Sequence, residues 1–183
     1  MLALDWNNGN RNVLADPLLT GLILGQTLQT KPEEIYRALI EATAFGAAKI
    51  IKRIEAYDVP IKDVITCGGL SVKNPLLMQI YADVLNKRIL VSDIDQTCAF
   101  GAEIFDAVIA GPEKGGFAAV SEAQDALCVM KEKVYEPIAE NYAVYIKLFA
   151  LYEQLHDAFG QSGSSASLAN VLKEFLQIKS EQV

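Results

Sequence analysis

The chain has 183 residues, of which 51% are hydrophobic and 21% charged, and its formal net charge is −7. This composition excludes a disordered chain and is typical of one domain with a sizeable core, alone or with an appendage. The acidic balance argues against nucleic acid or an anionic membrane surface as the main partner.

The counts of two residue types narrow the chemistry further. There is one histidine, His156, so a zinc site or a Ser-His-Asp triad is hard to build. The three cysteines, Cys67, Cys98 and Cys128, form no CxxC motif, which predicts buried thiols in a reducing compartment. No apolar run reaches the roughly 18 residues that a membrane helix needs, and no signal peptide precedes Leu2. We therefore expect a cytoplasmic protein.

The first 28 residues are the hardest to interpret. Met1–Asp5 is a short apolar run that begins abruptly, and a polar turn cluster around Gly9 follows it. Because a domain seldom begins within a strand, we expect the chain to be truncated on its N-terminal side. Leu14–Leu28 is apolar with two glycines, which fits either a helical turn or a surface hairpin.

Lys31–Tyr57 has the longest helical pattern in the sequence. Pro32 at its start and Glu33 and Glu34 in the first turn are favourable at a helix N-terminus. The middle of the helix, EATAFGAA, consists almost entirely of small residues. Gly46 there costs about 1 kcal/mol relative to alanine, a cost usually offset by another backbone that packs close. We therefore expect a central, mostly covered helix.

The segment from residue 64 to residue 84 predicts a strand, a glycine turn and a helix. Val64–Cys67 is a β-type run, Gly68 and Gly69 break it, and Asn74 and Pro75 open an apolar helical pattern. Glycines let a ligand approach the backbone, and a helix N-terminus attracts anions. Any strand-to-helix turn in an α/β protein can contain two glycines, so turn chemistry explains this pattern equally well.

A second strand and a second helix follow this unit. Arg88–Ser92 is predicted to be a strand, and Thr97–Ala110 a helix that Gly111 and Pro112 end. The order strand, helix, strand, helix predicts a crossover unit in a parallel sheet.

Two further helices complete the main part of the chain. Ser121 and Gln124 have capping-box spacing and predict a helix to about Lys133, and Pro137–Phe159 predicts a long helix that Gly160 ends.

The last residues differ in composition. Gln161–Ser165 is a Ser/Gly linker, and Ser167–Ile178 has the pattern of an amphipathic helix. We therefore expect a main domain at residues 1–159 and a linker with a C-terminal helix at residues 160–183.

Four segments together resemble the FGGY carbohydrate kinases, most closely the C-terminal domain of the bacterial members that phosphorylate L-ribulose. They are DWNNGNR, LQTKPEEIYRALIEATAFGA, CGGLSVKNPLLMQIYADVLN and QTCAFGAEIFDAV. Their order and spacing are similar to those of the family, and the resemblance extends from Leu2 to about Phe159. It implies an α/β fold of the actin-like (ribonuclease H-like) type, with a mainly parallel sheet and several helices. In this family two such domains enclose a cleft, and the C-terminal one holds most of the ATP.

The resemblance also implies which residues contact ligands. The segment CGGLSVKN matches the adenosine motif of the family, and the glycine of CAFGAE matches a glycine beside the adenosine site. The expected nucleotide-binding residues are Gly68, Gly69, Leu70, Lys73, Asn74 and Gly101. Glu41 matches a position that faces the sugar. DWNNGNR matches a loop at the domain cleft, to which we assign no chemistry because such turn residues are usually solvated.

Other parts of the family pattern are absent. Neither an Asp-Gly-Gly-Thr loop nor a Gly-Thr-Ser loop, which bind phosphates in the family, occurs in the sequence. The catalytic aspartate lies upstream in the family, so we expect no catalytic residue and no metal ligand in this chain. The resemblance thus implies the ATP-binding part of a kinase of arabinose catabolism. Together with an N-terminal domain of the same enzyme, it would use ATP and Mg²⁺ to convert L-ribulose into ribulose 5-phosphate. The resemblance leaves open whether the enzyme forms a homodimer.

Two alternatives remain at this point. The chain can belong to another FGGY kinase, for xylulose, glycerol or a related polyol, since most substrate contacts come from the other domain. It can also be an inert actin-like module used for assembly, because a fold does not fix a function. The coding region upstream of Leu2 would separate a kinase from an inert module.

Glu41 also has two interpretations. It can be a solvated acid paired with Arg37 one turn earlier, which contributes about 0.3–0.5 kcal/mol. The alanines that follow it on the same stripe, Ala44 and Ala48, favour a covered position instead. A covered carboxylate needs a partner, and a sugar hydroxyl in a domain cleft is one.

Overall fold

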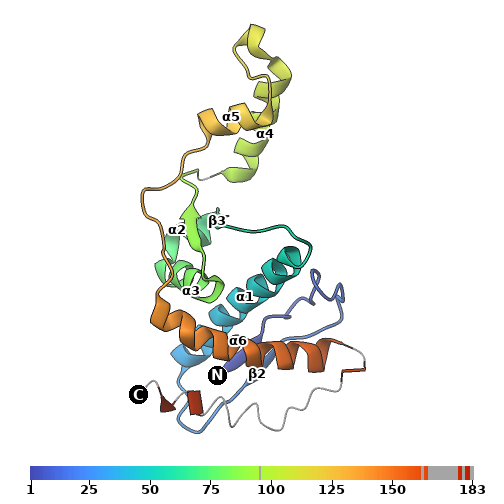
Figure 1. Cartoon of the computed structure of the whole chain (residues 1–183), viewed down its shortest axis with the longest axis vertical. Coiled ribbons are helices and arrows are strands. Elements are labelled where there is room, and N and C mark those ends of the chain that lie inside the picture. Colours follow the sequence, from blue (N-terminus) through green and yellow to red (C-terminus); the bar gives the residue numbers. More distant parts are fainter. Residues whose placement is uncertain (95, 162, 165–176, 179, 182–183) are drawn as a thin grey trace. The chain divides into compact units, whose positions relative to one another are not determined.

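The computed structural model describes the chain except for residues 95, 162, 165–176, 179 and 182–183. Its elements in chain order are β1 (Leu2–Leu4), β2 (Leu22–Leu24), α1 (Pro32–Glu55), β3 (Asp63–Thr66), α2 (Gly69–Lys73), α3 (Pro75–Leu85), β4 (Arg88–Val91), α4 (Thr97–Ala110), the 3-10 turn η1 (Pro112–Lys114), α5 (Val120–Leu127) and α6 (Ala139–Gly160). Figure 1 shows the chain coloured along its sequence, with α1 to α6, β2 and β3 labelled.

The chain folds as two compact units. The first unit comprises Met1–Lys62, Ile80–Lys87 and the described residues from Pro137 onward. The second unit comprises Asp63–Gln79 and Arg88–Glu136.

The first unit is built around β1. All three residues of β1 are buried, and the strand pairs antiparallel with β2, with Ala3 opposite Ile23. Strand β1 also contacts both long helices, α1 and α6. The pairing with β2 decides the structure of Leu14–Leu28, whose central residues form a strand and not a helix.

Helices α1 and α6 meet through aromatic side chains. The ring of Phe45 lies 5.3 Å from that of Tyr152, 5.9 Å from that of Phe149 and 6.0 Å from that of Tyr145, measured between centroids. Aromatic rings at such separations add to the apolar burial that holds two helices together. The start of α6 is fixed by the buried carboxylate of Asp83, which accepts hydrogen bonds from Ile138 N and Asn141 Nδ2, both at 2.8 Å.

Helix α1 is buried in its middle only, which is less than the mostly covered helix that the sequence predicted. Six residues are buried there: Ala38, Ile40, Glu41, Ala42, Ala44 and Phe45. The reason that the sequence offered for Gly46 was wrong. A Cβ at this glycine would lie 3.5 Å from both carboxylate oxygens of Asp5, so the close neighbour is a side chain and not a backbone.

The two strands of the predicted crossover lie in the second unit. Strands β3 and β4 pair in parallel, with Val64 opposite Ile89, and helix α3 follows β3 in the chain and precedes β4. The far edge of β4 is also paired, through Ile89 with Tyr135 and Ser92 with Met130. In the described part of the chain no strand pairs with the other edge of β3. The parallel pair is therefore confirmed, and the sheet of the first unit is an antiparallel pair.

Two other helices confirm their predicted starts or ends. Asn74 Oδ1 accepts a hydrogen bond from Leu77 N at 3.0 Å, so Asn74 caps α3, which begins at Pro75. Helix α4 has its predicted bounds, and Gly111 ends it with a φ of 73° that favours glycine. The loop expected between Gly69 and Asn74 is instead the short helix α2.

The prediction for α5 was wrong at both ends. The helix starts at Val120, so Ser121 lies inside it, and Glu122 Oε2 accepts a hydrogen bond from Ala118 N at 3.0 Å. It ends at Leu127, not near Lys133, because residues 129–135 pair with the region of β4 and extend the backbone.

Three other expectations concern cysteines, membrane spans and the C-terminus. Cys67 and Cys98 are exposed and Cys128 is half-buried, so the thiols are free as expected, but the expectation of burial was wrong. Within the described residues no helix has the length and apolar character needed to cross a membrane. The helix expected at Ser167–Ile178 lies almost entirely outside the described residues.

Candidate functional site

The glycine turn of the second unit has a backbone that only glycine adopts easily. Gly68 follows β3 with a φ of 87°, in the region that L side chains rarely occupy. The chain then enters α2, where the buried hydroxyl of Ser71 donates a hydrogen bond of 2.7 Å to the carbonyl oxygen of Gly68. This bond fixes the turn from inside and leaves its outer side to solvent.

The space around this turn is open. A Cβ at Gly68 or at Gly69 would have no other atom within 4 Å, so neither glycine is needed for internal packing. Leu70, the next residue, keeps 74% of its surface exposed, and Lys73 and Asn74 follow within one turn. The backbone of Gly68 and Gly69 is therefore accessible to a flat or apolar ligand group.

Gly101 lies in the first half of α4, in the same unit. It also has open space where a side chain would be, with no atom within 4 Å. All six residues expected to bind nucleotide, Gly68, Gly69, Leu70, Lys73, Asn74 and Gly101, thus lie in the second unit.

Glu41 lies in the first unit and is buried, with a relative exposure of 8%. Its Oε1 atom accepts hydrogen bonds from Arg37 Nε at 2.8 Å and from the Tyr145 hydroxyl at 2.9 Å. Arg37 Nη2 donates to the same hydroxyl at 3.2 Å, which closes a triangle between α1 and α6. The carboxylate therefore has partners within the protein.

The ionisation of this triangle follows from its contacts. The hydrogen bond to Glu41 raises the pKa of the Arg37 guanidinium above its usual value. Burial raises the pKa of the Tyr145 hydroxyl, and the Glu41 charge raises it further. Both shifts keep the protons on the two donors, as the geometry of their hydrogen bonds requires.

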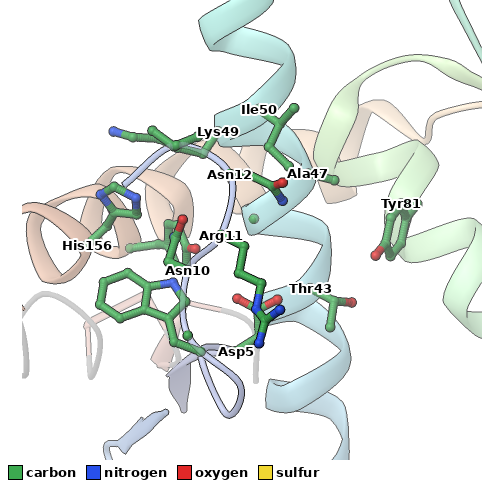
Figure 2. A pocket seen from close by; sticks show the side chains of 15 residues that line it. Asp5, Asn10, Arg11, Asn12, Thr43, Ala47, Lys49, Ile50, Tyr81 and His156 are labelled. Carbon is green, nitrogen blue, oxygen red and sulfur yellow. The ribbon is translucent and has the colours of Figure 1, made fainter. Parts of the chain in front are cut away.

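The segment DWNNGNR forms a pocket in the first unit with α1, α3 and α6. Figure 2 shows the His156 and Tyr81 rings on opposite sides of this pocket, with Asp5 and Arg11 between them in this view. Its volume is about 270 Å³. The lining residues are Asp5, Trp6, Gly9, Asn10, Arg11, Asn12, Val13, Thr43, Gly46, Ala47, Lys49, Ile50, Tyr81, Tyr152 and His156.

Asp5 is the acidic residue among those that line this pocket. Burial raises the pKa of its carboxyl, although its own backbone N–H and the nearby His156 oppose the shift. Burial also raises the pKa values of the Tyr81 and Tyr152 hydroxyls, and the Asp5 charge adds to both shifts. The Asp5 carboxylate therefore interacts electrostatically with the hydroxyl groups of both tyrosines in this pocket.

His156 and Trp6 form the wall next to Asp5. Their rings meet edge to face with centroids 5.4 Å apart, and both residues are buried. His156 Nδ1 contacts Asp157 Oδ1 at 2.9 Å, whereas His156 Nε2 and Trp6 Nε1 are buried without a hydrogen-bond partner in the described structure. Buried polar atoms normally have partners, so these two atoms need an explanation.

Sequence reasoning missed three of these pocket residues, Tyr81, Tyr152 and His156. They come from α3 and α6, at least 70 residues after DWNNGNR, and no local spacing connects them. Gly46 was the one signal of this pocket in the sequence, because a glycine inside a helix leaves room for another group to pack close to the helix backbone.

The described residues contain no group of three His, Cys, Asp or Glu side chains arranged to hold a metal ion. Neither the glycine turn nor the pocket in the first unit therefore supplies a complete metal site.

The chain was compared with protein families and curated proteins. Residues 1–110 match the family described as "FGGY family of carbohydrate kinases, C-terminal domain". A ribulokinase of Geobacillus thermodenitrificans is 53% identical over 88% of the chain, and a ribulokinase of Halalkalibacterium halodurans is 47% identical over 100% of it. The chain spans only 28% and 31% of the lengths of these two relatives.

Solved structures resemble the chain in fold. A xylulose kinase of Lactobacillus acidophilus superposes with a TM-score of 0.72 at 24% identity, over 88% of this chain and 31% of that chain. A glycerol kinase of Plasmodium falciparum with ADP gives a TM-score of 0.66 at 18% identity, over 86% and 30%. At these identities the likeness shows the fold alone, which is the α/β fold of the C-terminal domain of sugar kinases.

Proposed function

Because the chain belongs to the FGGY family of carbohydrate kinases, we propose that it is the C-terminal, ATP-binding part of an enzyme that phosphorylates L-ribulose. The reaction converts ATP and L-ribulose into ADP and ribulose 5-phosphate. The observation that carries this proposal is the 53% identity to a ribulokinase over 88% of the chain. The enzyme would act in arabinose catabolism, and we assign it to the cytoplasm.

The nucleotide site of this proposal is the glycine turn. Gly68 and Gly69 would contact the adenosine through their backbone, with Leu70, Lys73 and Asn74 beside it and Gly101 opposite. Open space at three of these glycines and the exposure of Leu70 support the assignment. The glycerol kinase with ADP is a neighbour in fold, which agrees with a nucleotide as ligand.

This chain would bind and orient the nucleotide, and other parts of the enzyme would carry out the phosphoryl transfer. Phosphoryl transfer needs the γ-phosphate and an oriented hydroxyl in line, and Mg²⁺ when bound would neutralise phosphate charge. The chain has neither phosphate loop of the family nor its catalytic aspartate, and the relatives are about three times as long. The N-terminal domain of the same enzyme is therefore the proposed partner that supplies these groups, and most of the metal ligands with them.

Glu41 is proposed as a contact of the sugar. Its burial supports a covered position, and its two protein hydrogen bonds both use Oε1. The Arg37 and Tyr145 contacts would hold the carboxylate in place while Oε2 accepts a sugar hydroxyl.

A chimera tests the function. This chain would replace the matching C-terminal part of the Geobacillus ribulokinase, and L-ribulose-dependent formation of ADP would be measured. We expect the chimera to phosphorylate L-ribulose faster than D-xylulose or glycerol, and the isolated chain to phosphorylate none of them. A folded chimera that prefers D-xylulose or glycerol would overturn the choice of sugar, and activity of the isolated chain would overturn the assignment of the catalytic groups.

A glycine substitution tests the nucleotide site. Gly69→Val places a branched side chain into open space, so the fold should persist while ATP no longer reaches the backbone. Amide chemical shifts on ATP titration of the 183-residue chain would map to residues 68–74 and disappear in the variant. Ala126→Val, at an exposed position of α5, is the matched control. Unchanged ATP shifts in Gly69→Val would contradict the assignment.

A further inference from the structure

We propose that one face of α4 is a docking surface for a helix from the N-terminal part of the same enzyme. We call Cys98, Ala102, Phe105 and Ile109 the docking face. The proposed partner helix carries an apolar stripe with basic side chains beside it. This inference rests on the proposed function, because that proposal joins this chain to an N-terminal part.

Helix α4 is rich in apolar residues but buries only one of them. Its charged residues are Glu103 and Asp106, and its buried residue is Ile104. Within the second unit α4 packs mainly on α5 and on η1, as the elements labelled in Figure 1 show for the two helices. A helix that is apolar on several sides is normally covered on more than one of them. The cover that α5 and η1 provide leaves most of α4 exposed.

The docking face is a continuous stripe along α4. Its four residues follow one another at positions i, i+4, i+7 and i+11, which lie on one side of a helix. Phe105 is 59% exposed and Ile109 is 82% exposed, and Cys98 and Ala102 are exposed as well. This alternation of four and three residues is the spacing with which two helices pack along a shared seam. A contiguous apolar surface of this kind indicates an interaction site.

The second unit has little core of its own, so it gains stability from a partner that covers it. Helices α2 and α5 also bury one residue each, Ser71 and Ala123. On one face of the β3–β4 pair Ile89 and Val91 are buried, whereas Ile65 on the other face is 61% exposed. Parallel strands are normally covered on both faces. Two separate surfaces of this unit therefore lack the cover that its fold calls for.

The relatives contain the protein that can supply this cover. The family match is to a C-terminal domain, and the chain spans 28% and 31% of the two ribulokinases. In the proposed kinase most of the enzyme thus lies outside this chain. A partner in the same polypeptide is present at high effective concentration, so even a weak contact stays formed. This favours the N-terminal part over a separate protein.

The charges of α4 indicate the chemistry of the partner. Glu103 and Asp106 are both acidic and exposed, and the formal net charge of the chain is −7. A second copy of the chain would bring its own acidic residues to the same contact, and like charges there oppose association. A helix with lysine or arginine beside its apolar stripe would instead pair with these carboxylates. The charge pattern therefore favours a basic partner helix over self-pairing.

Thiol labelling compares the docking face in the 183-residue chain and in the full-length enzyme. Both would carry Ile109→Cys, with the native thiols removed by Cys67→Ser, Cys98→Ala and Cys128→Ser, and would react with a maleimide at low protein concentration. We expect fast labelling in the chain and labelling slowed about tenfold or more in the enzyme, because a covered thiol reacts only when the contact opens. Ala126→Cys, exposed on α5, is the matched control and should react equally in both.

Lysine substitutions test the same face without added thiols. Ile109→Lys should leave the melting temperature of the 183-residue chain unchanged, since the position is exposed there, and should lower that of the full-length enzyme by several degrees. Asp106→Lys should also lower the melting temperature of the enzyme, because it places a cation beside a basic partner. Glu132→Lys, an exposed charge reversal outside α4, is the control for Asp106→Lys.

Three outcomes would overturn the proposal. Rapid labelling of Ile109→Cys in the folded enzyme would show that the docking face is uncovered. An unchanged melting temperature of the enzyme with Asp106→Lys would rule out the basic partner. Protection of Ile109→Cys in the 183-residue chain, with a doubled mass in sedimentation, would identify a second copy as the occupant. Labelling and melting require no catalysis, so these failures leave the kinase function intact, whereas the chimera tests that function separately.

Discussion

Among individual residues, Glu41 has contacts that separate a structural role from a sugar-binding one. Glu41→Gln weakens the hydrogen bonds from Arg37 and Tyr145, and should lower the free energy of unfolding of the chain by about 1–3 kcal/mol. Tyr145→Phe removes one of these bonds and should cost about 1 kcal/mol. Urea unfolding monitored by circular dichroism would measure both, with the exposed Glu132→Gln as control.

The kinetics of the full-length enzyme then distinguish the two roles. A sugar contact at Glu41 should raise KM for L-ribulose in Glu41→Gln more than it lowers kcat, because a positioning contact binds ground and transition states alike. Tyr145→Phe removes one of the contacts that hold this carboxylate in place, so it should raise KM less than Glu41→Gln does. If both variants lose stability and neither changes KM, Glu41 is structural only.

His156 makes the stability of the first unit depend on pH. Burial lowers the pKa of its imidazole below the ordinary value of about 6.5, although Asp157 opposes the shift. The unfolded chain therefore binds a proton at a higher pH than the folded chain does. Stability should be constant above about pH 7 and should fall as the pH drops below about 6.5.

Thermal melting between pH 8 and pH 5 measures this dependence. Since His156 is the one histidine of the sequence, His156→Gln should flatten the profile in this window. The raised pKa of Asp5 acts in the opposite direction and in a more acidic range, where protonation restores stability. A slope that persists in His156→Gln would assign it to another group.

At residue level the sequence predicted the burial of Glu41 and its contact with Arg37, one turn away, but not its distant partner. The alanines around Glu41 indicated a covered carboxylate, and the structure confirms that it is buried. Its partner Tyr145 lies 104 residues away, so no local pattern could reveal the bond. The orphaned ring nitrogens of the pocket were equally invisible, because burial of His156 depends on how α6 packs.

Among the elements, α3 shows how one residue combines a structural and a proposed functional role. Asn74 caps the helix through its hydrogen bond with Leu77 N, and Asn74→Ala should cost about 1 kcal/mol of stability. Asn74→Ser keeps an oxygen that can cap and should cost much less. Differential scanning calorimetry would compare the two variants.

The same pair of variants tests the nucleotide contact proposed for Asn74. If the amide group touches the adenosine, ATP binding should weaken in Asn74→Ser although its stability is retained. Equal ATP affinity in the wild-type chain and Asn74→Ser would leave Asn74 with the capping role alone.

The ends of an element could be predicted where residues at those ends determine them, and not where contacts with distant parts of the chain do. Pro32, Pro75 and Gly111 mark helix ends by their own backbone chemistry, and the structure agrees at all three. Helix α5 ends early because the following residues pair with the region of β4, a tertiary contact that overrides local helical preference. Strand β2 was undecided for the same reason, since its pairing with β1 spans about 20 residues.

For the molecule as a whole, the family and the main crossover could be predicted, but the division into units could not. The first unit joins three separate segments of the chain, and strand β1 contacts a helix near the other end of the described chain. A boundary of this kind leaves no mark in local composition. The pocket belongs to such a unit, which is why its lining emerged only from the structure.

Within the described residues, one edge of β3 pairs with no other strand, which has a consequence for handling the 183-residue chain by itself. A strand edge that is not covered by another strand offers its backbone groups to other chains, and the side chain of Ile65 in β3 is 61% exposed. Purified chain should therefore self-associate as its concentration rises, with light scattering increasing and amide exchange at residues 64–66 slowing. Ile65→Lys should keep it monomeric, since lysine at an edge opposes strand pairing, whereas Leu18→Lys, at a position that is 87% exposed in the first unit, should not. A wild-type chain that stays monomeric at all concentrations would show that this edge does not pair with other chains. If the chain does self-associate, it is best produced joined to the rest of its enzyme.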